Sequence, residues 1–201
     1  MELEPGLFLY SGYYDRSAQT VLRDTIRKIV DAAPLFQPTM PKTGKPLSVK
    51  MSNCGPLGWV ADKAGYRYQE VHPASGAPWP QMPSLLLDLW DAVAGDAPKP
   101  QACLINYYQP DAKMGLHQDR DEAVFTAPVV SVSLGDECRF RIGTNQRNGP
   151  TKSFKLTSGD VLVMSGNSRL AFHGVDRIFP GTSTLLKAPG RINLTLRRVT
   201  A

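Results

Sequence analysis

The 201-residue sequence is poor in the residues that build crosslinks and metal clusters. It contains three cysteines, Cys54, Cys103 and Cys138, and none of them belongs to a Cys-x-x-Cys pair. An odd number of scattered cysteines argues against a disulfide framework and against a structural zinc site. We therefore expect reduced thiols in or near the core of a cytoplasmic protein.

Long apolar runs, internal repeats and low-complexity segments are also absent from the sequence. No uninterrupted apolar stretch reaches the roughly 18 residues that predict a membrane-spanning helix. The N-terminal segment begins with acidic residues and has no basic region before its short apolar run, so no secretory signal is expected. Hydrophobic residues at 42% and charged residues at 20% are typical of a soluble globular chain and exclude collagen or wholesale disorder. The length fits a single domain over residues 1–201, which we expect to be a monomer.

The charge balance of the chain is mildly basic. Lysine and arginine together number 23 and aspartate and glutamate 18, which gives a formal net charge of +5 at pH 7. This balance is compatible with a polyanionic partner such as a nucleic acid. A basic enzyme that never meets a nucleic acid fits the charge equally well.

The first half of the chain carries two helical patterns. Apolar residues recur at helical spacing from Leu22 to Ala33, which predicts an amphipathic helix over 17–33 with Ser17 as its cap and Pro34 as its stop. A second helix is predicted over 84–93, ended by Gly95. Residues 34–83 lie between them and are rich in proline, glycine and polar residues, so we expect long loops with a short hairpin.

The pattern changes from residue 101 onward. Short β-branched or aromatic segments alternate with turn residues, and they read ACLINYY, PVVSVSLG, ECRFRIG, KSFKL, GDVLVMSG and RINLTLRRV. Their spacing predicts an all-β sandwich or barrel against which the N-terminal helices pack. The expected fold class is therefore α+β and mainly β.

Two histidines and an aspartate are placed to share a metal ion. In His117-Gln118-Asp119, residues two apart point to the same side of an extended segment. His173 follows an apolar strand 56 residues later, far enough to return on a neighbouring strand. Two imidazoles and one carboxylate with open positions form the facial triad of non-haem Fe(II) oxygenases. A polar turn at 117–119 and a purely structural His173 remain the alternative interpretations.

The last predicted strand carries a second polar constellation. Arg191, Asn193, Thr195 and Arg197 alternate with apolar residues, so all four would project from one face. Two guanidinium groups inside a barrel are costly without an anion, and a dicarboxylate such as 2-oxoglutarate would supply two carboxylates. The alternative is an exposed polar face with solvated arginines.

These motifs together resemble one family. HQD, the later histidine in RLAFHG, and RINLTLR are closely similar to the AlkB family of Fe(II)/2-oxoglutarate-dependent dioxygenases. The resemblance continues through SNCGPLGW, GYRY, PWPQMP, ACLINYYQP, LHQDRDE and APVVSVSLG, in order and with consistent spacing. It covers the chain from about residue 50 to the end, and the first 45 residues match less distinctively.

The resemblance implies a fold and a division of the chain. The family fold is a double-stranded β-helix, or jelly roll, with outer helices and an N-terminal nucleotide-recognition lid. Residues from about 50 to 100 would include the lid, and residues from about 101 to 201 would form the catalytic core.

The resemblance also assigns metal and cosubstrate residues. His117, Asp119 and His173 would bind Fe(II), and O2 would be the second cosubstrate. Arg191 would pair with the distal carboxylate of 2-oxoglutarate and Arg197 with the carboxylate next to the keto group. Three further residues would complete the 2-oxoglutarate site: Asn106, Tyr108 and Asn193.

By the same resemblance, a second group of residues would bind the substrate. Trp59 and Tyr66 match aromatic residues of the lid, and Trp59 with the His117 ring would stack on a flipped base. Asp121 would suit a cationic methylated base. Tyr68 and Arg147 would contact the substrate or its backbone. Core packing for Trp59 and a solvated surface acid for Asp121 are the alternatives. Four cations are candidates for phosphate contacts: Lys113, Arg120, Lys152 and Arg169.

The activity implied by the resemblance is oxidative demethylation of N-alkylated bases in direct-reversal DNA repair. The expected lesions are 1-methyladenine and 3-methylcytosine, with formaldehyde, succinate and CO2 as products. Single-stranded DNA is the preferred substrate, while duplex DNA and RNA remain open. The alternatives are the same chemistry on RNA or protein methyl groups, and a non-catalytic sensor or nucleic-acid-binding module on the same jelly roll. The triad and both arginines argue against that module.

Overall fold

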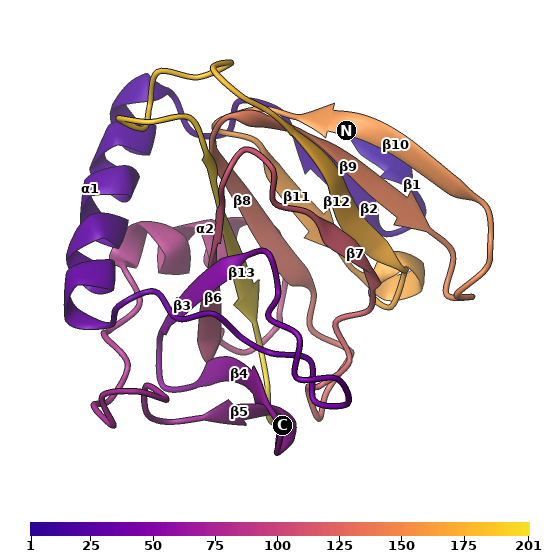
Figure 1. Cartoon of the computed structure of the whole chain (residues 1–201). Coiled ribbons are helices and arrows are strands. Elements are labelled where there is room, and N and C mark those ends of the chain that lie inside the picture. The colour runs from indigo at the N-terminus through magenta and orange to yellow at the C-terminus, as the bar shows by residue number, and fades with distance from the viewer.

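Two β-sheets packed face to face form the body of the molecule, and helices cover the outer side of the larger one (Figure 1). The computed structural model describes all 201 residues. The seven-stranded sheet has the order β1-β2-β11-β8-β13-β6-β3. Its strands are β1 (Glu2–Glu4), β2 (Leu7–Tyr10), β3 (Lys50–Cys54), β6 (Ala102–Tyr108), β8 (Val129–Gly135), β11 (Val161–Met164) and β13 (Arg191–Arg197).

The smaller sheet has four strands in the order β10-β9-β12-β7. They are β7 (Met114–His117), β9 (Glu137–Gly143), β10 (Thr151–Leu156) and β12 (His173–Phe179). A separate hairpin pairs β4 (Gly58–Asp62) with β5 (Gly65–Gln69). The expectation of a mainly β jelly roll with outer helices is confirmed.

Both predicted helices are present, with adjusted ends. Helix α1 spans Arg16–Ala32 and α2 spans Ser84–Val93, and a 3-10 turn, η1, lies at Gly166–Ser168. Asp15, not Ser17, caps α1, because its carboxylate accepts the Ala18 amide at 2.8 Å. Neither helix is long and apolar enough to cross a membrane.

The N-terminal strands were not predicted. β1 pairs with β2, and β2 pairs with β11, so the first residues of the chain extend the large sheet. In residues 34–83, β3 joins the large sheet beside β6, and the helix that follows this segment, α2, packs into the hydrophobic core. Of the strands in the segment expected to include a lid, only those of hairpin β4–β5 therefore lie outside the two main sheets.

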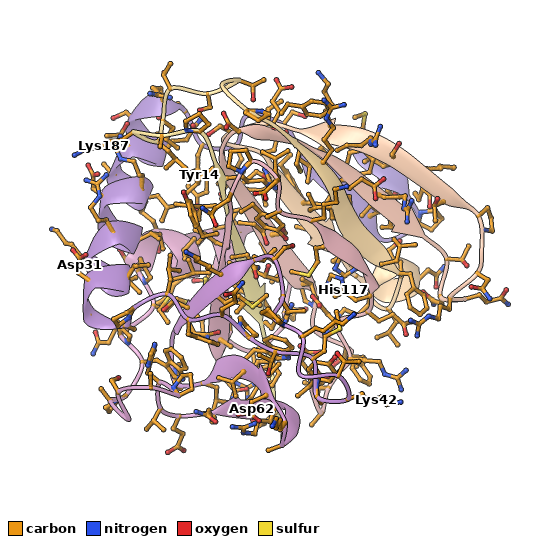
Figure 2. All side chains as sticks on the ribbon, viewed as in Figure 1. Tyr14, Asp31, Lys42, Asp62, His117 and Lys187 are labelled. Carbon is orange, nitrogen blue, oxygen red and sulfur yellow. The ribbon has the colours of Figure 1, made fainter.

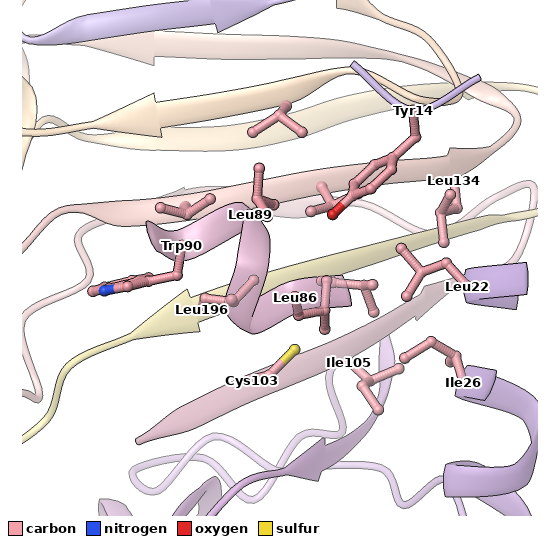
Figure 3. Close-up of a cluster of buried hydrophobic side chains, with 14 of the residues drawn as sticks. Tyr14, Leu22, Ile26, Leu86, Leu89, Trp90, Cys103, Ile105, Leu134 and Leu196 are labelled. Carbon is pink, nitrogen blue, oxygen red and sulfur yellow. The ribbon is translucent and has the colours of Figure 1, made fainter. Parts of the chain in front are cut away.

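The hydrophobic core lies on both faces of the large sheet. One cluster fills the space between this sheet and the two helices, and Leu22, Ile26, Leu86 and Trp90 are among its members (Figure 3). A second cluster lies between the two sheets and surrounds the polar face of β13. Leu194 and Leu196 of β13 belong to the helix-side cluster, so the alternation of this strand turns its polar residues toward the interior of the jelly roll.

Candidate active site

The register of the small sheet brings the two histidines together. His117 ends β7 and His173 begins β12, and the two residues are directly opposite each other in this antiparallel pair. Their ring centroids are 4.5 Å apart. Asp119 follows two residues after β7, and one donor atom from each of the three residues lies within 4.8 Å of the others. Figure 2 shows His117 beside β7, above the hairpin that carries Asp62.

The backbone orients both imidazole rings. The Nδ1 atom of His117 lies 2.9 Å from the Gly115 carbonyl, and that of His173 lies 2.9 Å from the Ala171 carbonyl. A carbonyl oxygen only accepts, so each Nδ1 donates and each Nε2 is the ring nitrogen left to bind a metal. Burial lowers the pKa of His173 to about 4, which keeps that ring neutral at pH 7. Neutral rings with a fixed tautomer are what metal ligation requires.

The Asp119 carboxylate is buried and ionised. Burial by itself would raise its pKa, but the Arg197 guanidinium holds that pKa well below its usual range. Its Oδ1 atom forms an ion pair with Arg197 Nη2 at 2.8 Å, while Oδ2 is buried without a hydrogen-bond partner. An unpartnered carboxylate oxygen beside two free imidazole nitrogens fits a divalent cation such as Fe(II).

The polar face of β13 lies inside the protein, so the alternative of solvated arginines is wrong. Arg191 is 1% exposed and Arg197 6% exposed. Arg191 Nη2 donates to Ser133 Oγ at 2.8 Å, whereas its Nε and Nη1 atoms are buried without partners. Buried guanidinium donors without acceptors are costly, and the carboxylate of a bound dicarboxylate would satisfy them.

Strand β6 completes this cavity beside β13. Asn106 is directly opposite Asn193 in the register, and Tyr108 is opposite Arg191. Asn106 Nδ2 donates to Asn193 Oδ1 at 3.1 Å, and Asn106 Oδ1 is buried without a partner. Burial raises the pKa of the Tyr108 hydroxyl above its ordinary value, so this group stays protonated and can donate. The residues present therefore fit 2-oxoglutarate.

A single cavity of about 540 Å³ joins the metal ligands, the β13 face and the hairpin. Trp59 and Tyr66 stack at its mouth with ring centroids 5.7 Å apart and an interplanar angle of 17°. Trp59 Nε1 donates to Asp121 Oδ2 at 2.8 Å. Of the residues expected to contact substrate, the structure brings four to this cavity: Trp59, Tyr66, Asp121 and Arg147.

The structure places Tyr68 differently from these four residues. It does not line the cavity, and its hydroxyl donates to Glu122 Oε1 and accepts from Arg197 Nη1 at 2.9 Å. Burial raises the pKa of this hydroxyl far above its ordinary value. Glu122 was not singled out from the sequence. It lies in the charged run Asp119-Arg120-Asp121-Glu122, where nothing local distinguishes it from its neighbours.

One of the proposed phosphate contacts is corrected by the structure. Arg169 is 2% exposed and donates to the carbonyl groups of Ala127 and Asp119, so it cannot reach a phosphate on the surface. Lys152 is exposed but forms an ion pair with Glu4. Arg120 lines the active-site cavity.

Comparisons with known proteins agree with this geometry. The family model described as the 2OG-Fe(II) oxygenase superfamily matches residues 6–197. The chain is 51% identical over 194 residues to the alpha-ketoglutarate-dependent dioxygenase AlkB homolog of Caulobacter vibrioides, covering 96% of this chain and 88% of that protein. It is 40% identical over 200 residues to AlkB of Escherichia coli K12, covering 98% and 91%.

A solved structure shows the same fold. The structure of OsALKBH1 matches with a TM-score of 0.77 at 32% identity and covers 98% of this chain and 100% of that one. The family requires Fe(II), 2-oxoglutarate and O2, and the donor sets described above fit the metal and the diacid. The chain therefore belongs to the 2OG-Fe(II) oxygenase superfamily and, within it, to the AlkB family of dioxygenases.

Proposed function

We propose that the protein oxidatively demethylates 1-methyladenine and 3-methylcytosine in DNA, with single strands preferred, and so repairs these lesions directly. The observation that carries this proposal is the composition of the cavity mouth. A stacked Trp59–Tyr66 pair and the exposed Asp121 carboxylate lie above a floor formed by the metal triad. Aromatic faces suit a flat ring, and a carboxylate suits a cationic one.

The base would enter between aromatic surfaces. Trp59 from the hairpin and His117 from β7 both line the cavity, and together they can replace the stacking that a flipped base loses. Only Oδ2 of Asp121 is engaged, by the Trp59 indole, so Oδ1 is free to accept from an exocyclic amino group. Methylation at the pairing edge blocks base pairing, which lowers the cost of extruding the base.

The chain's own residues hold the reactants of the oxidation. Arg191 and Arg197 would bind the two carboxylates of 2-oxoglutarate, and the Tyr108 hydroxyl and Asn106 amide would add hydrogen bonds. Bound Fe(II) supplies the activation of O2 that converts 2-oxoglutarate into succinate and CO2 and oxidises the N-methyl group, which leaves as formaldehyde. The buried walls of the cavity limit access of water to the reacting methyl group.

A substrate panel tests the proposal. With a single-stranded 3-methylcytosine oligonucleotide, formaldehyde and succinate should form in equal amounts, and formaldehyde release should require both Fe(II) and 2-oxoglutarate. Parallel reactions contain the duplex, the matching RNA and a methyl-lysine peptide. The proposal fails if the DNA strand is unchanged, or if the peptide is the preferred substrate. If the matching RNA is demethylated faster than the DNA, the substrate is RNA, which is one of the alternatives given by the sequence analysis.

The role of Asp121 gives a second test. Asp121→Asn should weaken binding of the 3-methylcytosine oligonucleotide about 10-fold relative to one with neutral 3-methylthymine, because a hydrogen bond to a charged group is worth about 1.5–3 kcal/mol. Fluorescence anisotropy measures both dissociation constants. Asp96→Asn, at an exposed acid outside the cavity, is the matched control and should leave the ratio unchanged. If Asp121→Asn weakens binding of both oligonucleotides equally, Asp121 does not recognise the charge of the base.

A further inference from the structure

Hairpin β4–β5 is attached to the segment that follows the metal ligand Asp119. Trp59 and Tyr68 are directly opposite each other in the hairpin register. Trp59 Nε1 donates to Asp121 Oδ2, and the Tyr68 hydroxyl donates to Glu122 Oε1. Two cross-strand partners thus bind two consecutive carboxylates, at the second and third positions after Asp119.

The two attachments differ in their surroundings. The Trp59–Asp121 bond lies at the exposed mouth of the cavity. The Glu122 side chain is 1% exposed, and its Oε2 atom accepts from Arg169 Nη2 at 3.3 Å. Arg169 also donates to the Asp119 carbonyl at 2.7 Å. The inner attachment therefore belongs to a buried network that reaches the backbone of the metal ligand.

Arg197 is the member of this network that faces the cavity. Its Nη2 atom forms an ion pair with Asp119 Oδ1 at 2.8 Å, its Nη1 atom donates to the Tyr68 hydroxyl at 2.9 Å, and its Nε atom lies 3.6 Å from Glu122 Oε1. A long arginine side chain loses up to about 2 kcal/mol of rotamer entropy when it is fixed in place. Here that ordering is complete before any ligand arrives, because the hairpin and the post-β7 segment hold the guanidinium from two sides.

We propose that Tyr68 and Glu122 are positioning residues that fix Arg197 for 2-oxoglutarate and, through the same contacts, link the base-binding hairpin to the cosubstrate site. This inference rests on the proposed role of Arg197 in binding 2-oxoglutarate. Because the Tyr68 hydroxyl bonds to Arg197 and its ring belongs to the hairpin, movement of the hairpin changes the contacts of the guanidinium. Binding of base and cosubstrate is then energetically coupled, and the coupling is reciprocal.

Tyr68→Phe tests the link, because it removes one hydroxyl and keeps the ring. In Mn(II)-loaded protein, calorimetry should show 2-oxoglutarate binding weakened about 10-fold, which corresponds to about 1.4 kcal/mol. In the wild type, a saturating 3-methylcytosine oligonucleotide should tighten 2-oxoglutarate binding, and in Tyr68→Phe this effect should vanish. In turnover, KM for 2-oxoglutarate should rise while kcat at saturation stays within about threefold.

Tyr14→Phe is the matched control. Tyr14 is a buried tyrosine whose hydroxyl donates to the Leu85 carbonyl at 3.0 Å, and it lies outside the cavity. It should lose stability like Tyr68→Phe but leave the 2-oxoglutarate affinity and its coupling unchanged. Glu122→Gln, which keeps the shape of the side chain and removes its charge, should reproduce the weaker binding of Tyr68→Phe.

The outcomes separate this inference from the function on which it rests. If Tyr68→Phe changes only the stability and leaves 2-oxoglutarate binding and coupling at wild-type values, the positioning role is overturned. If Arg197→Met binds 2-oxoglutarate as the wild type does, the role of Arg197 fails, and this inference fails with it. If the methylated oligonucleotide does not bind at all, the proposed substrate is wrong, while the calorimetric comparison of Tyr68→Phe with the wild type still decides the positioning role.

Discussion

Replacing His117 by alanine should abolish formaldehyde release from a 3-methylcytosine oligonucleotide. The loss should exceed the about 10- to 100-fold drop that follows removal of a group merely supporting a metal ligand, because a ligand itself is removed. The reason lies in the register of the small sheet, which leaves no other imidazole close enough to replace it: His72 is held by the Pro34 carbonyl at 2.8 Å, outside the cavity. Formaldehyde release and calorimetric titration with Mn(II) measure the two effects.

His72→Ala is the control for this substitution. It removes a buried imidazole, so its cost in folding stability should be at least as large as that of His117→Ala, whose side chain is partly exposed, but Mn(II) affinity should stay at the wild-type value. Turnover by His117→Ala at a substantial fraction of the wild-type rate would contradict the metal assignment. So would equal loss of Mn(II) binding in the two variants.

Replacing Arg191 by methionine should raise KM for 2-oxoglutarate on the order of 100- to 1,000-fold. Two unpartnered guanidinium donors face the cavity, and each hydrogen bond between charged groups contributes about 1.5–3 kcal/mol. Arg191→Lys should fall between this variant and the wild type, because it keeps the charge and loses the planar fork. Stabilisation against thermal unfolding by added 2-oxoglutarate gives a second measure that is independent of turnover.

Arg23→Met serves as the control for the loss of an arginine. Arg23 pairs with Asp24 and donates to the Leu185 carbonyl on the outside of the molecule, so KM for 2-oxoglutarate should not change. If Arg191→Met binds 2-oxoglutarate with wild-type affinity, the distal carboxylate is bound elsewhere.

The geometry of the metal ligands follows from local periodicity. His117 is the last residue of β7 and Asp119 lies two residues beyond it, so the alternation of an extended chain predicts that their side chains share one side. The same period turns Arg191 and Arg197 to the inner face of β13. Residues that share a face in this way are predictable, because side chains of an extended backbone alternate between its two sides. In β13, the burial of the neighbouring leucines against the helices then turns the arginines to the inner face.

The network around Glu122 could not be predicted in this way. Glu122 follows Asp121 directly, so nothing local distinguishes the buried carboxylate from the exposed one. Burial comes from Tyr68, more than 50 residues earlier, and from Arg169, more than 40 residues later. Arg169 looks like a surface cation for the same reason. The N-terminal strands were missed because LFLY has no polar alternation and its partner β11 lies more than 150 residues away.

The direct pairing of His117 with His173 has a mechanical consequence for the small sheet. β7 is the edge strand, it is four residues long, and β12 is its only neighbour. A divalent ion bound by both imidazoles would crosslink β7 to β12. It would fix the register of this edge strand, which has no second neighbour to keep it from fraying. Binding of iron would then affect the fold as well as the reaction, because it would set the rigidity of the cavity wall that carries His117.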